Sequence, residues 1–141
     1  MADLSVLIRL HKHELDEKRR ALAGLYGEMA MLDQERDRLE REFAAEKAAA
    51  AERLDEIHYT FPHYVETVRR RREALDRAKL ALEKKVEAAK DSLMDTFSEL
   101  KKYEMTQEER ERLEREEQLV KENATFDQIA LEGFMRNKKD D

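Results

Sequence analysis

The 141-residue sequence contains no cysteine, no tryptophan, one proline and three glycines. Without cysteine the chain has no disulfide, no thiolate nucleophile and no thiolate metal ligand, which fits a reducing compartment. Because residues that break helices are scarce, long uninterrupted helices are expected. Aromatic residues make up 6% of the chain, and alanine, glutamate, lysine, leucine and arginine dominate. This composition is typical of coiled coils rather than of globular cores.

Long apolar runs are also absent. No stretch approaches the roughly 18 residues that a membrane span requires. The first nine residues lack the basic start and the apolar length of a signal peptide. We therefore expect a soluble cytoplasmic protein.

Charge changes sign along the chain. Residues 1–58 carry 10 basic and 14 acidic side chains, residues 59–105 carry 11 and 9, and residues 106–141 carry 7 and 11. A nucleic-acid-binding protein requires a concentrated positive field, which this distribution does not supply. No nucleic-acid partner is expected.

Pro62 separates two long stretches that each keep a seven-residue apolar repeat. Proline is tolerated in the first turn of a helix but costs about 3 kcal/mol in its interior. We predict a first helix over about 3–58, a turn over about 59–61, a second helix over about 62–122 and a short helical tail over 123–141. Helices joined by a short turn lie antiparallel. The predicted fold class is all-α, a long antiparallel two-helix coiled-coil hairpin.

The repeat defines the seam along which the helices should pack. Its first-helix positions are Ile8, Leu15, Leu22, Met29, Arg36, Phe43, Ala50 and Ile57, with Leu4, His11, Lys18, Leu25, Leu32, Leu39, Glu46 and Arg53. Its second-helix positions are Phe61, Val68, Leu75, Leu82, Ala89, Thr96 and Tyr103, with Val65, Arg72, Lys79, Val86, Leu93 and Leu100. The leucines at positions 22, 25, 32, 39, 75, 82, 93 and 100 are the predicted core of this seam.

A turn centred near residue 60 sets the predicted register. Leu39 then lies at the level of Leu82, and Ile8 lies at the level of Leu113. The polar seam residues Arg36, Arg72 and Lys79 weaken the pairing but fix its register.

The second helix has two internal start signals. Thr106 to Glu109 reads as a capping box, so the helix either restarts near 104–106 or runs straight through. A second capping box at Thr125 opens the apolar tail. The hairpin returns Leu4 and Leu7 to this end of the chain. Together with the apolar residues of the tail, they exceed what one seam can cover, which predicts a partner-binding surface. Its tail members are Phe126, Ile129, Phe134 and Met135.

The opposite end carries Tyr64 and Val68, directly before the arginine cluster 69–72. One interpretation is an apolar cap of the hairpin beside a solvated charged face. The other is a recognition site, in which Tyr64, Arg69 and Arg70 contact an acidic partner surface.

Catalysis is not expected. The four histidines lack the carboxylate or cysteine partners of a metal site, and the chain has no glycine-rich phosphate loop or nucleophile motif. A two-helix hairpin encloses no pocket, so we predict a non-enzymatic protein without metal or cofactor.

The chain resembles the FliJ family, the coiled-coil component of the flagellar type III protein export apparatus. The resemblance lies in residues 89–104 (AKDSLMDTFSELKKYE), residues 127–132 (DQIALE) and the opening residues 4–10 (LSVLIRL). It implies an antiparallel hairpin similar to the central stalk of rotary ATPases.

The resemblance also implies partners. They are the hexameric export ATPase at the end that holds the termini, the cytosolic domain of the export-gate protein FlhA, and export chaperones. Gate contacts carried over from the family fall on Tyr64 and Val68. The implied location is the cytoplasmic face of the inner membrane, reached only through the export apparatus. The alternatives are a stand-alone structural scaffold and a prefoldin-like holdase, which needs apolar tips on both helices.

Overall fold

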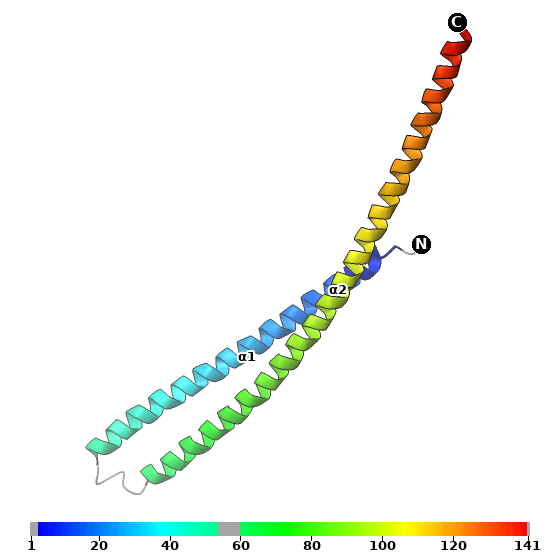
Figure 1. Ribbon diagram of the computed structural model, residues 1–141. Helices are drawn as coiled ribbons and strands as arrows, with labels where there is room; N and C mark the ends of the chain where they lie inside the picture. The colour runs from blue at the N-terminus through cyan, green and yellow to red at the C-terminus, as the bar shows by residue number, and fades with distance from the viewer. Residues whose placement is uncertain (1–2, 54–59, 141) are drawn as a thin grey trace. The chain divides into compact units, whose positions relative to one another are not determined.

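The structure, a computed structural model, describes residues 3–53 and 60–140. These residues form two helices, α1 (Ser5–Glu52) and α2 (Phe61–Asp140), and contain no β-strand (Figure 1). The all-α two-helix fold predicted from the sequence is confirmed. Contacts divide the chain into a hairpin unit, residues 13–96, and a terminal unit, residues 1–12 together with 97–141.

Both helix starts have a local cause. The Asp3 carboxylate accepts hydrogen bonds from the backbone N–H of Ser5 (3.0 Å) and from its hydroxyl (2.7 Å), and these bonds lower the pKa of Asp3. Such a cap satisfies one of the free N–H groups of the first turn. In α2, Pro62 occupies the first turn, where its missing N–H leaves no hydrogen bond unmade.

The first helix is shorter than predicted. It ends at Glu52 rather than near residue 58, and Arg53 is not helical. The seam residue Ile57 and the first residue of the predicted turn, position 59, lie outside the described residues.

In the hairpin unit α1 and α2 lie side by side and antiparallel (Figure 1). The Lys79 ammonium lies 3.3 Å from the Asp33 carboxylate, and the Arg72 guanidinium lies 2.6 Å from Glu40. The buried residues of this unit all occupy seam positions, and they are Leu15, Leu39, Val68, Leu82, Val86 and Thr96. The remaining predicted core leucines of the unit are half-buried, namely Leu22, Leu25, Leu32, Leu75 and Leu93.

In the terminal unit the start of α1 packs against α2 near residues 99–107. Leu4 and Leu100 are buried, and the His11 ring lies 5.0 Å from the Tyr103 ring between centroids. The Gln107 side chain donates a hydrogen bond to the Asp3 carboxylate at 3.5 Å. Beyond this level α2 continues without α1 beside it (Figure 1).

The observed register differs from the prediction by about ten residues along α2. The pairs of Glu40 with Arg72 and of Asp33 with Lys79 place Leu39 at the level of Arg72, whereas the prediction placed Leu39 at the level of Leu82. The cause is the earlier end of α1, which moves the centre of the connection toward the N-terminus. The seam residues themselves are unchanged, because the heptad positions define them whatever the register.

The second helix is continuous, so of the two alternatives at 104–106 it runs straight through, and no separate helix starts at Thr125. The Thr106 hydroxyl donates to the Lys102 carbonyl oxygen (2.8 Å), and the Thr125 hydroxyl donates to that of Lys121 (2.9 Å). Both threonine hydroxyls thus bond to the preceding turn of the same helix, as threonines do inside helices. Neither threonine caps the start of a new helix. Residues 123–140 belong to α2 and do not form a separate tail helix.

Leu39→Ala tests the seam. Leu39 is 6% exposed, so its truncation should lower the free energy of unfolding by about 2–4 kcal/mol. Leu80→Ala is the matched control, since Leu80 is 54% exposed and should change stability by less than about 0.5 kcal/mol. Thermal melts followed by circular dichroism measure both. Equal melting temperatures for the two variants would contradict the packing of Leu39.

Candidate partner-binding surfaces

The predicted contact residues at the start of α2 face α1. Val68 is 1% exposed, which makes it the most deeply buried side chain among the described residues. Tyr64 is half-buried, and its ring lies 6.3 Å from that of Phe43 and 6.4 Å from that of Phe61. Tyr64 therefore extends the seam, which the heptad pattern did not indicate. In this arrangement Val68 is covered by the hairpin and offers no surface to a partner.

The arginine cluster is largely paired within the chain. Arg69 binds Glu66 (2.5 Å) and Glu73 (2.7 Å), and Arg70 lies 3.5 Å from Glu66. The hydrogen bond from Arg69 lowers the pKa of Glu66, and the same contact raises the pKa of Arg69. Both arginine side chains stay mostly exposed. The surface is thus a mixed band of ion pairs, in which the Arg70 side chain is 76% exposed.

A charged network that the sequence did not reveal spans the hairpin unit. Glu40 receives two hydrogen bonds of 2.6 Å from Arg72 and lies 3.5 Å from Arg36, which also pairs with Asp76 across the seam. The Arg72 guanidinium also lies over the Phe43 ring, 4.8 Å from its centroid. In this network Arg72 binds both carboxylate oxygens of Glu40 and also covers the Phe43 ring. The heptad pattern places these cations in the seam, but their acidic partners lie beside it.

Lys18 is accommodated in a different way. Its ammonium donates to the Thr96 hydroxyl (2.5 Å) and to the Ser92 carbonyl oxygen (3.3 Å), and it lies 3.4 Å from Glu14. Thr96 is buried, so this bond satisfies a polar group inside the seam.

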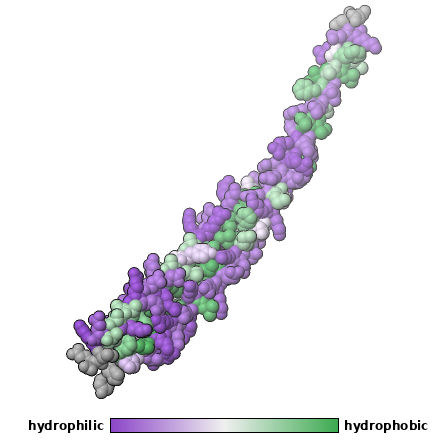
Figure 2. Space-filling model, turned by 60° about the vertical axis from the view of Figure 1, so that its left-hand side comes forward, coloured by the Kyte–Doolittle hydropathy of each residue, from purple (hydrophilic) through white to green (hydrophobic). Residues whose placement is uncertain are grey.

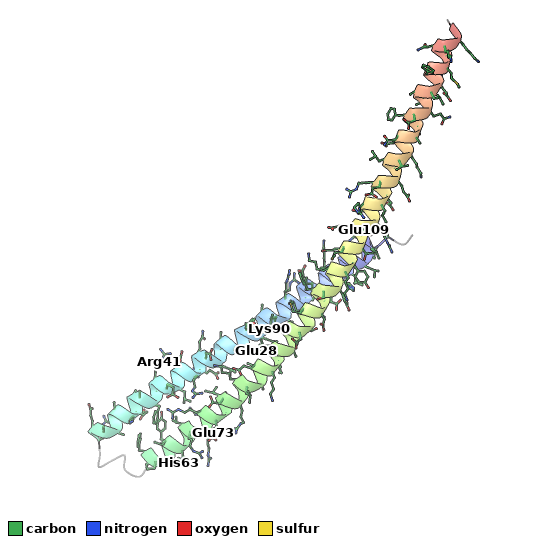
Figure 3. The ribbon with its side chains drawn as sticks, in the orientation of Figure 1. Glu28, Arg41, His63, Glu73, Lys90 and Glu109 are labelled. Carbon is green, nitrogen blue, oxygen red and sulfur yellow. The ribbon has the colours of Figure 1, made fainter. Side chains whose placement is uncertain are left out.

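After residue 110, every residue of α2 is exposed up to position 139 except Gly133. Side chains beyond Glu109 project outward around the helix, as Figure 3 shows. The exposed large apolar residues of this segment, which we call the lone helix (111–139), are Leu113, Leu119, Val120, Phe126, Ile129, Leu131, Phe134 and Met135. Figure 2 shows them as green groups separated by hydrophilic surface toward the C-terminal end.

The apolar residues of the lone helix do not share one face. Met135 lies nine residues after Phe126, about two and a half turns, which places the two side chains on opposite sides of the helix. Phe126 is 69% exposed and Phe134 is 65% exposed. A single partner helix covers one stripe of about 100°. Full cover of this segment therefore requires a partner that surrounds it.

Ion pairs within α2 support the lone helix. Arg112 binds Glu109 (2.5 Å) and Glu116 (3.2 Å), and Arg136 lies 3.9 Å from Glu132. Pairs three and four residues apart each stabilise an isolated helix by about 0.2–0.5 kcal/mol. The helix can thus persist without tertiary packing.

The predicted N-terminal members of the apolar surface lie elsewhere in the terminal unit. Leu4 is buried at the level of Gln107, and Leu7 is partly exposed. Phe126 lies nineteen residues further along α2, about 28 Å of helix. The expected meeting of Leu4 and Leu7 with the tail is therefore wrong, because the register places α1 earlier on α2.

The described part of the chain offers neither a metal site nor a membrane span. Within residues 3–53 and 60–140, no group of three His, Asp or Glu side chains is arranged to hold a metal ion. In the same residues, neither helix has a stretch long and apolar enough to cross a bilayer. No protein-family model, curated protein or solved structure matches this sequence.

The Glu40 network predicts a pH-dependent stability. Hydrogen bonding to Arg72 lowers the pKa of Glu40 below its ordinary 4.5. A carboxylate with a lowered pKa contributes stability that is present above its unfolded-state pKa and lost as the pH falls through its folded-state pKa. Glu40→Gln should therefore lower the melting temperature at pH 7 and have little effect below the folded-state pKa.

Glu42→Gln is a matched control, because the Glu42 carboxylate lies 4.0 Å from Arg38 on the same helix and pairs with no residue across the seam. Melts between pH 2 and pH 7 compare the variants with the unmodified chain. A Glu40→Gln effect that stays constant over this range would contradict the role of its charge.

Proposed function

We propose that this chain is a non-enzymatic stalk and adaptor of a flagellar type III export apparatus. It couples a hexameric export ATPase to the export gate and escorts export chaperones. It acts in the cytoplasm and reaches the inner membrane only through that apparatus. Supporting this proposal are the resemblance of residues 4–10, 89–104 and 127–132 to the FliJ family and the antiparallel pairing of α1 with α2.

The lone helix is the observation that carries the proposal. Its large apolar residues point to opposite sides of one helix, and no other segment among the described residues of the terminal unit packs against them. Exposed apolar surface of this extent marks an interaction site. Apolar side chains on opposite sides of one helix are covered together only by a partner that surrounds the helix. The central opening of a hexameric ring encloses a helix in this way.

A ring that encloses one stalk also explains how the stalk alters ATP turnover without carrying out chemistry itself. A single helix cannot contact six equivalent subunits equally. Its binding therefore favours an asymmetric state of the ring, and differential affinity for ring states shifts their populations. Such a bias alters ATP turnover without any catalytic residue on the helix.

The start of α2 is the proposed contact for the gate's cytosolic domain. Arg70 offers an accessible cation beside the half-buried Tyr64. Val68 contributes in this arrangement by holding the hairpin together, and contacts a partner directly only where α1 has moved away from it.

Replacing Phe126 and Phe134 by glutamine tests the ATPase contact. Exposed aromatic residues of an interface commonly carry about 2 kcal/mol or more each, so affinity for the cognate export ATPase should fall at least about tenfold. Stimulation of ATP hydrolysis should fall with it, while helicity stays constant. Titration of the ATPase with the chain, followed by phosphate release, measures both quantities.

Leu80→Gln is the matched control, because Leu80 is an exposed apolar residue of the hairpin unit. It should stimulate hydrolysis like the unmodified chain. Full stimulation by the Phe126 and Phe134 variant would refute the stalk proposal. Self-association through the lone helix, seen by sedimentation and lost in the same variant, would instead favour a structural scaffold.

Arg70→Glu tests the gate contact. Reversal of an accessible interface charge should weaken binding to the gate's cytosolic domain about tenfold, and more so at low salt. Arg77→Glu serves as control, since Arg77 is also exposed but lies two turns further along α2. Isothermal titration calorimetry at two salt concentrations measures the affinity of each variant for the gate's cytosolic domain. Identical affinities for the two variants would remove Arg70 from the interface.

A further inference from the structure

We propose that the hairpin unit has two registers, the observed one and a second in which α1 lies one heptad further along α2. The two arrangements use the same seam residues and nearly equivalent contacts. This proposal concerns the hairpin itself and does not depend on the export function.

The observed register follows from the cross-seam ion pairs. Extending the pairing of Glu40 with Arg72 and of Asp33 with Lys79 along the heptads places one seam residue of α1 opposite one of α2 in each layer. The layers that are apolar on both sides are Ala50 with Phe61, Phe43 with Val68, Met29 with Leu82, Leu25 with Val86, and Leu22 with Ala89.

The shifted register produces the same number of such layers. They are Ala50 with Val68, Phe43 with Leu75, Leu32 with Val86, Met29 with Ala89, and Leu25 with Leu93. In both registers the seam cations at 36 and 79 lie opposite leucines. Burial of apolar surface is the main driving force of helix pairing, and it therefore distinguishes the two registers only weakly.

Of the cross-seam ion pairs made by Arg36, Glu40 and Asp33, two are replaced by others. Arg36 pairs with Asp76 in the observed register, and the shift brings Glu83 to it. Glu40 exchanges Arg72 for Lys79, and Asp33 loses its partner. The observed register keeps the advantage of the bidentate pair of Glu40 with Arg72 and of the hydrogen bond from Lys18 to the buried Thr96, so it is the more populated one.

A shift in the opposite direction is not equivalent. It would bring Arg36 to the level of Arg69, and Glu40 to the apolar Val65. Like charges at this distance destabilise a helix pair. The charge pattern thus permits sliding in one direction only.

Chain length permits the shift as well. One heptad corresponds to about 10 Å along a helix. The residues between the helices, 53–60, span at most about 26–29 Å. In the shifted register the first two turns of α2 extend past the end of α1, which uncovers Tyr64 and one side of Val68. Tyr64, which is half-buried in the observed register, and one side of Val68 then become a surface.

Engineered cysteines distinguish the registers, because the chain has none of its own. Leu25→Cys with Val86→Cys reports the observed register, and Leu25→Cys with Leu93→Cys reports the shifted one. A disulfide requires Cα atoms within about 7 Å, so a pair aligned in one register cannot close in the other. We expect the first pair to close rapidly under mild oxidation and the second to close more slowly but to completion.

Leu25→Cys with Asp91→Cys is the control for helix separation, because Asp91 is exposed on the outer side of α2. Closure of the shifted-register pair no faster than this control would overturn the proposal. Circular dichroism confirms folding of each reduced variant. Where a variant fails to fold, Met29→Cys with Leu82→Cys and Met29→Cys with Ala89→Cys form an independent set for the same two registers.

Charge reversal provides a second readout. Asp76→Lys repels Arg36 only in the observed register and should raise the rate of shifted-register closure about threefold, the effect of one exposed ion pair. Glu83→Lys repels Arg36 only in the shifted register and should lower that rate by a similar factor. Equal rates for the two variants would also overturn the proposal.

Discussion

A pair of helices has a single seam, and every buried side chain in it is covered by one partner helix and by the side chains that flank the seam. The described residues accordingly include few buried side chains, among them Leu15, Leu39 and Val68. The flanking charged residues complete the cover. Arg72 shows how, because its guanidinium lies over the Phe43 ring while binding both oxygens of Glu40. The side chains that form these ion pairs therefore also cover the apolar residues of the seam.

The same constraint separates two kinds of apolar residue. Within the seam, apolar side chains are explained by the pairing of α1 with α2. In the lone helix they are not, since ion pairs such as Arg112 with Glu116 keep that segment helical without packing. Phe126 and Phe134 therefore do nothing for the fold of the isolated chain. The exposed Phe126 and Met135 lie on opposite sides of an otherwise charged helix, and this arrangement is what points to an enclosing partner.

The heptad repeat was sufficient to predict the fold class and the residues of the seam, because period and polarity are local properties of a sequence. The register was not predictable in this way, since a shift of seven residues returns an equivalent pattern. The end of α1 at Glu52 also lacked a signal, because the alanines at 48–51 favour continued helix. The threonine-based capping boxes were misleading, because Thr106 and Thr125 satisfy their hydroxyls equally well inside a helix.

A weakly fixed register has consequences at the other end of α1. Coiled coils usually fix register with a polar residue that finds its partner in one alignment only. Here Arg36 and Lys79 face leucines in both alignments, so the choice falls to the hydrogen bond of Lys18 to the buried Thr96 and to ion pairs worth about 0.2–1 kcal/mol each. In the terminal unit, Val6, Leu7 and Leu10 on α1 are exposed, as is Met105 on α2.

A partner that holds apolar groups of both helices is sensitive to their relative position. Sliding by one heptad moves the α1 groups by about 10 Å along α2, so such a partner must bind the two registers with different affinities. Reversing a hundredfold preference takes about 5.5 kcal/mol of differential affinity. A micromolar interface has about 8 kcal/mol in total, so binding at the termini is able to reset the alignment of α1 and α2. The uncovering of Tyr64 and of one side of Val68 would then follow from an event at the opposite ends of the helices.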